Sequence, residues 1–410
     1  MSNDRDRTPS PVSTFSIFLV GIAGVLITVL KPALLSSYVS HGGIDEIVAG
    51  YMISLEIVAA FLGTLLIALR GHIWDRRRAV IIGLGLLLGG NLLTAGVQGP
   101  VLIACGRLIA GLGEGLAVGL FAASLAGYPK PERLFGASTV ITLLIGAGAY
   151  QLVPIVLAWR GIAGFFLLVC VPVLLALLFS SAIPSRPLGR VAVAGKVPSA
   201  PLPLSAAVLA GGTIAYYVSV GGVWPYMGQI GVGTHLSAEA VSRIFGYSQL
   251  WGAVAAALAV LAGDRFGRAL PIAASVTLGV ICLFLLLALP GQPRVFALVA
   301  QAFMFGWLLF FPYLMGLTSS LDPVGRLSSL VYTAQSIGFF LGPALCAQAI
   351  RIGSYEMVLW FGVLCFATTL VVLLPVAIKQ DRRDARMTAI GEHQREAPGI
   401  SCRVDSRSTD

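Results

Sequence analysis

The feature of this chain that most constrains its fold is a series of about twelve apolar runs, each roughly 20 residues long and almost free of charge. A helix of that length crosses the hydrocarbon core of a bilayer, which is about 30 Å thick. Of the 410 residues, 57% are hydrophobic and 11% are charged, whereas soluble domains contain about 25% charged residues. The chain is therefore predicted to be an all-α polytopic membrane protein.

The apolar runs also divide the chain into parts. The predicted membrane spans are residues 15–37, 47–69, 79–97, 101–123, 137–157, 161–182, 204–228, 239–261, 269–289, 295–317, 327–350 and 355–378. We expect an N-terminal tail (1–14), a first six-helix bundle (15–182), a proline-rich linker (183–203), a second six-helix bundle (204–378) and a C-terminal tail (379–410). Because the C-terminal tail is polar, it is expected to be disordered.

Lysine and arginine are distributed unevenly between the predicted loops. With the N-terminus inside, 21 of the 27 Lys and Arg residues fall in inner segments and 4 in outer loops. Cytoplasmic loops of membrane proteins carry such an excess. Both termini are therefore expected in the cytoplasm, with the protein in the plasma (cytoplasmic or inner) membrane.

The two halves of the sequence repeat one pattern. "WDRRRAV" follows the second span and "GDRFGRAL" follows the eighth, so that Asp75 and Asp264 are 189 positions apart. Gly146 in the fifth span corresponds to Gly338 in the eleventh, 192 positions later. Nearly equal offsets predict twelve transmembrane helices in two pseudo-symmetric six-helix bundles. Parallel repeats of this kind occur in alternating-access transporters.

This layout resembles the major facilitator superfamily of secondary transporters over residues 15–378. In that family the inner loop after the second span typically reads G-x-x-x-D-R-x-G-R-R. Gly71, Asp75 and Arg76 match the pattern here, whereas an arginine replaces its second glycine. The loop after the eighth span keeps D-R-x-G-R in Asp264, Arg265, Gly267 and Arg268.

These two loops are candidates for a conformational latch between the bundles. An aspartate such as Asp75 can accept hydrogen bonds from N–H groups at a helix N-terminus and can pair with arginine. Contacts made in only one conformation bias a two-state equilibrium. The alternative, which we favour for Arg77 and Arg78, is that the arginines only determine topology.

The fourth span, "CGRLIAGLGEG", also matches a family pattern, R-x-x-x-G-x-G-x-(A/G). The matching residues are Arg107, Gly111, Gly113 and Gly115. Small residues allow helices in a membrane to approach closely. The resemblance implies a part in proton coupling for Arg107.

Four charged residues lie within the spans, and an ionisable residue inside a membrane is by default a functional candidate. Lys31, Glu56 and Arg107 belong to one predicted bundle and are expected to converge. Glu114 lies about 10 Å further along the helix of Arg107, at 1.5 Å per residue. All four are candidates for proton coupling.

Burial and nearby charge act in opposite directions on such a carboxylate, and this opposition favours proton exchange at Glu56 or Glu114. If one acid is protonated, the four groups carry a net positive charge, which suits an anionic substrate. Each residue also has a purely structural alternative. Glu56 could form a structural ion pair, Glu114 could bond to a neighbouring helix, and Lys31 could extend towards the membrane surface.

The resemblance further implies that the first, fourth, seventh and tenth spans line a central cavity. Aromatic and amide side chains there would suit a small organic molecule, although each could equally be a packing residue. The candidates are Tyr216, Tyr217, Trp224, Gln229, Gln301 and Trp307.

Together these features predict a secondary active transporter that moves a small organic solute by alternating access, with proton-coupled symport into the cell. The alternative is proton-coupled efflux of a drug-like compound. Drug/proton antiporters of the family carry a glycine and a proline where the fifth span has Tyr150 and Gln151, which favours uptake.

We expect no enzyme activity, because the four histidines lie in loops or the tail and none pairs at metal-ligand spacing. The chain has no phosphate-binding loop and so no site for ATP. We expect no cofactor, no metal and no nucleic acid. The expected partners are the substrate, protons and the bilayer, with the monomer as the functional unit.

Overall fold

The computed structural model describes residues 11–125, 128, 131–185, 204–322 and 326–396. Throughout these ranges the regular structure is helical. Within the described residues, twelve helices are long and apolar enough to cross a membrane, which agrees with the predicted number. The elements are α1 (Pro11–Val29), α2 (Lys31–Ser40), α3 (Glu46–Arg70), η1 (Gly71–Ile73), α4 (Arg76–Gly96), α5 (Pro100–Leu125), α6 (Pro131–Arg160), α7 (Ile162–Phe179), η2 (Ser180–Ala182), α8 (Leu204–Val232), α9 (Ala238–Ala262), α10 (Ala269–Ala288), α11 (Pro293–Leu321), α12 (Arg326–Ile352) and α13 (Tyr355–Glu396).

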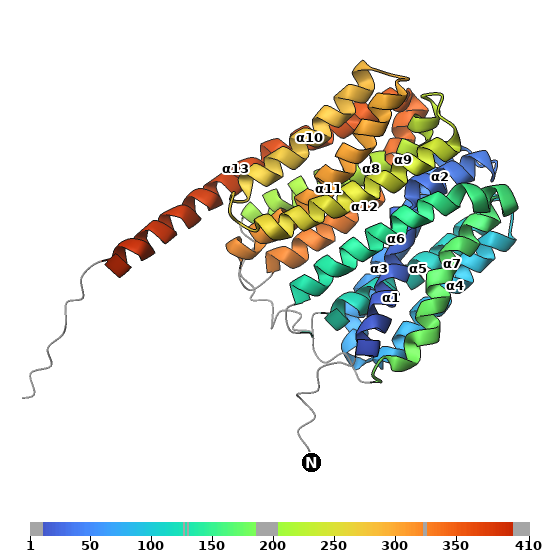
Figure 1. The fold of residues 1–410 in the computed structure, drawn as a ribbon, viewed down its shortest axis with the longest axis horizontal. Helices are drawn as coiled ribbons and strands as arrows, with labels where there is room; N and C mark the ends of the chain where they lie inside the picture. The colour runs from blue at the N-terminus through green and yellow to red at the C-terminus, as the bar shows by residue number, and fades with distance from the viewer. Residues whose placement is uncertain (1–10, 126–127, 129–130, 186–203, 323–325, 397–410) are drawn as a thin grey trace, which may run out of the picture.

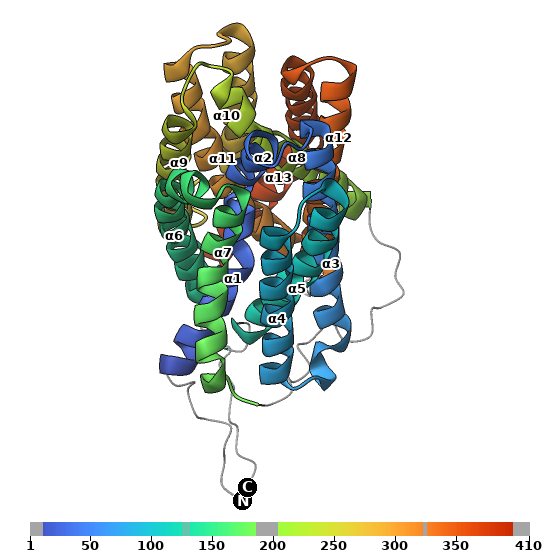
Figure 2. The same cartoon turned by 90° about the vertical axis from the view of Figure 1, so that its right-hand side faces the viewer.

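The helices form two groups, α1–α7 and α8–α13, which lie against each other in Figures 1 and 2. Both groups are built to one plan. In the first, α5 packs against α3 and α4; in the second, α11 packs against α9 and α10. Likewise, α4 packs against α7 and α10 against α13. These equivalent pairs confirm the predicted fold of two pseudo-symmetric six-helix bundles.

The first predicted span, residues 15–37, is divided into two helices. α1 ends at Val29, and α2 begins at Lys31 with Pro32 in its first turn. Proline lacks the N–H that would continue the backbone ladder. The break places Lys31 at the start of a new helix within the bundle, where its side chain is buried.

Glycines in α5 bring three helices of the first bundle close together. A Cβ atom on Gly115 would collide with the carbonyl oxygen of Ala60, and one on Gly111 with that of Glu56, both in α3. Gly113 faces the backbone of Leu87 in α4 in the same way. These contacts hold α5, which carries Arg107 and Glu114, directly against α3.

The two bundles contact each other through α3 with α12, α6 with α9, and α2 with α8. We call the end of the molecule that carries loops 41–45, 97–99, 233–237, 289–292 and 353–354 the far end. At this end Tyr355 donates a hydrogen bond to Glu46 and Gln348 donates one to Tyr51. Both bonds cross between the bundles, so the far end is closed by polar contacts.

The C-terminal tail differs from the expectation of disorder. α13 continues without interruption to Glu396 and projects beyond the bundles in Figure 1. A physical reason is visible in its first turns past the bundle, where Gln380 donates to Asp384 over 2.8 Å and two aspartates bind α10. Residues 397–410 and most of the linker, 186–203, lie outside the described residues, as do residues 1–10 of the N-terminal tail.

Candidate functional site

Glu56 of α3 lies between two cations in the interior of the first bundle. Lys31 Nζ is 3.5 Å from its Oε1, and Arg107 Nη1 is 3.6 Å from its Oε2. The exposed fractions are 4% for Lys31, 1% for Glu56 and 0% for Arg107. The structure thus brings together the three residues that the sequence places in one bundle. Two cations share a single carboxylate, so this triad carries an excess positive charge.

Arg107 is held by further contacts that were not predicted from the sequence. Its Nη2 donates to Asn91 Oδ1 over 2.6 Å, and its Nε donates to Thr94 Oγ1 over 3.3 Å. Its guanidinium also lies over the ring of Phe166, 4.6 Å from the centroid. Asn91 and Thr94 stand three residues apart in an otherwise apolar span, a spacing that puts them on one helix face. That spacing was the signal for a buried polar partner.

Glu114 is in a different environment from Glu56. Thr28 Oγ1 of α1 donates a hydrogen bond to its Oε1 over 2.8 Å. Among the described residues, the ion pairs involve Glu56 and Asp384 but not Glu114. Glu114 is nevertheless buried, with 6% of its surface exposed. The two acids are therefore unequal, because one has two cationic partners and the other has a hydroxyl group.

A cavity of about 220 Å³ lies between the two bundles. Both Lys31 and Glu114 line it, whereas Glu56 and Arg107 are set behind its wall. The remaining polar side chains of the wall are Thr28, Thr64 and Ser336, and the rest is mostly aliphatic and aromatic. The contributing helices are α1, α2, α3 and α5 from the first bundle, and α8, α11 and α12 from the second.

Of the six cavity residues expected from the sequence, Trp224 of α8 and Trp307 of α11 line the cavity. Tyr216 instead stacks on Phe310, with ring centroids 3.6 Å apart, and Tyr217 packs on Phe339. These tyrosines are core residues of the second bundle. Gln229 and Gln301 also lie outside the cavity lining.

Several residues of the cavity wall were not predicted from the sequence. Phe61 of α3 and Phe339 of α12 supply aromatic surface, and Thr28 supplies a hydroxyl. Thr28 precedes Lys31 by three residues, or about one helical turn. This spacing could have marked it as a neighbour of the intramembrane charges. Nothing in the surrounding apolar sequence distinguishes Phe61 or Phe339 from packing residues.

In the first latch loop, Gly71 ends α3 and opens the short helix η1. Asp75 is the N-cap of α4, where its Oδ1 accepts a hydrogen bond from Arg78 N over 2.8 Å. Such a cap compensates one of the unpaired N–H groups at a helix start. Arg76 follows in the first turn of α4. The carboxylate of Asp75 therefore caps its own helix in this structure.

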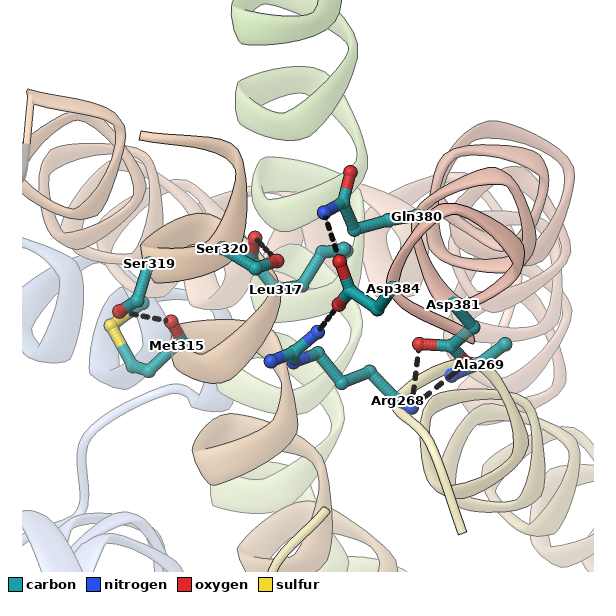
Figure 3. Close-up of polar contacts among 9 residues, drawn as sticks. All are labelled: Arg268, Ala269, Met315, Leu317, Ser319, Ser320, Gln380, Asp381 and Asp384. Carbon is teal, nitrogen blue, oxygen red and sulfur yellow. Dashed lines mark hydrogen bonds and ion pairs between the residues drawn. The ribbon is translucent and has the colours of Figure 1, made fainter. Parts of the chain in front are cut away.

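The second latch loop is bound to α13 (Figure 3). Asp381 accepts hydrogen bonds from Arg268 N over 2.9 Å and Ala269 N over 2.8 Å, at the start of α10. Arg268 Nη1 also lies 2.6 Å from Asp384 Oδ2. Gly267 has a φ of 66°, and its position leaves no room for a Cβ atom beside Asp381.

These bonds join α10 to α13 within the second bundle, so in this structure they do not connect the two bundles. Asp264 and Arg265 at the beginning of the loop are exposed. The backbone carbonyl of Asp264 accepts a hydrogen bond from Gly267 N over 2.9 Å, which forms the turn. The second loop therefore acts here as a brace for the extension of α13.

The family profile described as Major Facilitator Superfamily matches residues 14–343. The chain belongs to the major facilitator superfamily. No curated protein matches this sequence. Membership of the superfamily, together with twelve apolar helices, identifies an integral membrane transporter.

Solved structures of superfamily transporters share the fold. The xylose transporter XylE from E. coli, in an inward-open conformation, has a TM-score of 0.67 and 16% identity, covering 88% of this chain and 95% of that one. A peptide transporter POT in complex with alafosfalin has a TM-score of 0.71 and 16% identity, covering 92% and 96%. The human organic anion transporter MFSD10 has a TM-score of 0.64 and 16% identity, covering 88% and 100%. At these identities the likeness is one of fold.

Proposed function

We propose that this transporter moves a small organic solute into the cell by proton-coupled symport and alternating access. The observation that carries the proposal is the position of Glu114. Its carboxylate lies on the wall of the cavity between the bundles, with a hydroxyl group rather than a cation as its bonded neighbour. A group in that position can bind a proton from either side of the membrane as access to the cavity changes.

The two acids have separate roles in this proposal. Glu56 serves as the counter-charge of the two cations that flank its carboxylate, Lys31 and Arg107. Glu114 lies on the cavity wall and, among the residues that the structure describes, accepts a hydrogen bond from a hydroxyl group instead of forming an ion pair, which suits it as the proton acceptor. Lys31 and Arg107 link the two acids electrostatically and hold Glu56 in place.

Alternating access requires that the bundles separate at one end and close at the other. The Tyr355–Glu46 and Gln348–Tyr51 bonds close the far end in the present state. With both termini in the cytoplasm, as the Lys and Arg distribution favours, the far end faces outwards. The loops around Asp75 and Arg268 would then form latch contacts between the bundles in the opposite state.

Coupling to protons is supported by two relatives in fold, a D-xylose-proton symporter and a proton-dependent oligopeptide transporter. Uptake is favoured over efflux by Tyr150 and Gln151 in the fifth span. The same cavity would also serve a proton antiporter, which is the alternative.

The test uses proteoliposomes that contain purified protein and an internal pH-sensitive dye. Sugars, amino acids, organic acids and amines are added outside in turn. Symport predicts that a transported solute acidifies the interior, and that Glu114→Gln abolishes the acidification. Glu356→Gln, which removes an exposed carboxylate of α13, is the control and should behave as the unmodified protein.

The outcomes are distinct. Solute-driven alkalinisation of the interior would indicate the antiport alternative. Solute entry without any proton movement, or acidification that persists in Glu114→Gln, would overturn the proposed role of Glu114.

A further inference from the structure

The charges around the cavity constrain the substrate class. We propose that the cavity binds a small organic monoanion with a ring-sized apolar body, placing the anionic group at Lys31 while Glu114 takes up one proton. This inference rests on the proposed function, because it assumes that the proton is carried at Glu114. It adds a ligand charge, a ligand size and a position for the charged group.

The first step is the location of the positive charge. Glu56 is shared between Lys31 and Arg107, so the triad has one positive charge in excess. Arg107 is set behind the wall, where Asn91 and Thr94 hold it. Lys31 is the cation that reaches the cavity, and its 3.5 Å contact with Glu56 is long for a charge-assisted hydrogen bond. The excess charge is therefore presented to a ligand at Lys31 Nζ.

The second step is electrical neutrality. A net charge buried at low dielectric is costly. When Glu114 is ionised, the four groups sum to zero and the empty cavity is neutral. When Glu114 is protonated, they sum to one positive charge, and only a monoanion restores neutrality. A neutral ligand would leave one positive charge and a cation would leave two, so proton uptake at Glu114 selects a monoanion.

The groups that surround Glu114 are consistent with a coupling between its proton uptake and the binding of an anion. The charged groups that act on it are Lys31, Glu56 and Arg107, and α1 contributes the hydroxyl of Thr28. Those parts of α8, α11 and α12 that line the cavity contribute no charged side chain. The second bundle therefore supplies apolar surface and no competing counterion for the ligand.

The third step is size and shape. An apolar cavity of about 150 Å³ admits benzene, and the present cavity is about 220 Å³. It has room for a ring or a branched chain of similar size plus a carboxylate. Trp224, Trp307 and Phe339 from the second bundle provide flat apolar surface in the cavity wall. The ligand would thus span the two bundles, with its charge on the first and its body on the second.

The test measures charge selectivity on the purified protein with three matched sets of probes. Each set keeps one body and changes its charge: benzoate, benzamide and benzylamine; indole-3-acetate, indole-3-acetamide and tryptamine; 4-methylpentanoate, 4-methylpentanamide and 4-methylpentylamine. Binding is followed by the rise in melting temperature that a ligand of the folded state produces, and then by calorimetry. At least one carboxylate should bind, and its amide and amine should not.

Two variants locate the groups involved. Lys31→Gln should weaken carboxylate binding about 10- to 100-fold, the range for loss of one hydrogen bond to a charged group. Lys379→Gln, which removes an exposed lysine of α13, should leave it unchanged. In the unmodified protein, one proton should be taken up for each anion bound. Above the pH at which Glu114 of the ligand-free protein titrates, the dissociation constant of the carboxylate should therefore rise about tenfold per pH unit. Glu114→Gln should bind the anion with no such pH dependence.

The possible results test the ligand class and the symport mechanism separately. Preference for amines or amides, absence of binding by every carboxylate, or unchanged selectivity in Lys31→Gln would overturn the substrate class. Carboxylate binding without proton-driven accumulation in proteoliposomes would support the ligand class and contradict symport. Proton-coupled accumulation of an amine or a sugar would support symport and contradict the ligand class.

Discussion

Thr28 in α1 donates a hydrogen bond to Oε1 of Glu114 in α5 over 2.8 Å. This bond leaves the second oxygen of Glu114 available for a proton. It also joins two helices of the first bundle at the wall of the cavity, next to the second bundle. A change in the charge of Glu114 is therefore felt at the surface where the bundles must move.

Glu56→Gln should destabilise the protein, because it leaves Lys31 and Arg107 buried without a counter-charge. Removing one partner of a buried ion pair costs about 3–5 kcal/mol. The melting temperature in detergent should fall by several degrees, and Glu356→Gln should leave it unchanged. Adding Lys31→Met to Glu56→Gln should recover part of the loss. An unaltered melting temperature in the single variant would show that Glu56 is not the counterion of the triad.

Gly115→Ala should push α5 away from α3, because the new methyl group meets the backbone oxygen of Ala60. Overpacking of this kind typically costs about 1–3 kcal/mol. Gly85→Ala in α4 is the matched control, since nothing lies within 4 Å of its Cβ position. The melting temperature should fall for Gly115→Ala and stay unchanged for Gly85→Ala. Equal melting temperatures would mean that the α3–α5 contact can relax.

Asp381→Ala should weaken the start of α10 by removing the acceptor for two backbone N–H groups. Loss of a capping side chain costs about 0.5–2 kcal/mol. Hydrogen exchange should become faster at the backbone amides of Arg268, Ala269 and Leu270. Arg383→Ala removes an exposed side chain from the same part of α13 and should not alter the exchange. Equal hydrogen-exchange rates in Asp381→Ala and Arg383→Ala would show that Asp381 does not brace the start of α10.

Tyr355→Phe should favour opening of the far end, because it removes the hydrogen bond to Glu46. Spin labels at the exposed residues Ser40 and Ser354, one in each bundle, would report the separation. The population with longer distances should increase in the variant. Tyr247→Phe alters an exposed tyrosine on α9 and serves as the control. Identical distance distributions would show that this bond does not contribute to closure.

Much of the architecture could be predicted from the sequence, because membrane thickness sets the length of each apolar run. The four charges within spans were also identifiable, since charge is rare in such segments. Their roles were less accessible: both Glu56 and Glu114 are acids in apolar helices, and their difference arises from partners on α1, α2 and α5. Thr28 is 86 positions from Glu114 and Lys31 is 25 positions from Glu56, and the rotation of each helix decides which side chains meet.

The aromatic residues show the same limit. Tyr216 and Trp224 lie eight residues apart in α8, and both were candidates for the cavity. Tyr216 stacks within the bundle, while Trp224 reaches the cavity. Helical periodicity cannot distinguish the face that lines the cavity from the face that packs within the bundle when the whole helix is apolar. The helical extension of α13 was missed because its stabilising contacts with α10 are long-range in sequence.

The 42 residues of α13 form one continuous rod, roughly 60 Å long at 1.5 Å per residue. Because Asp381 and Asp384 fasten it to α10, the protruding part must tilt as the second bundle tilts. A small rotation near the cavity becomes a large displacement at the tip of this lever. A fluorophore near its end would convert each transport cycle into a motion large enough to follow on single molecules.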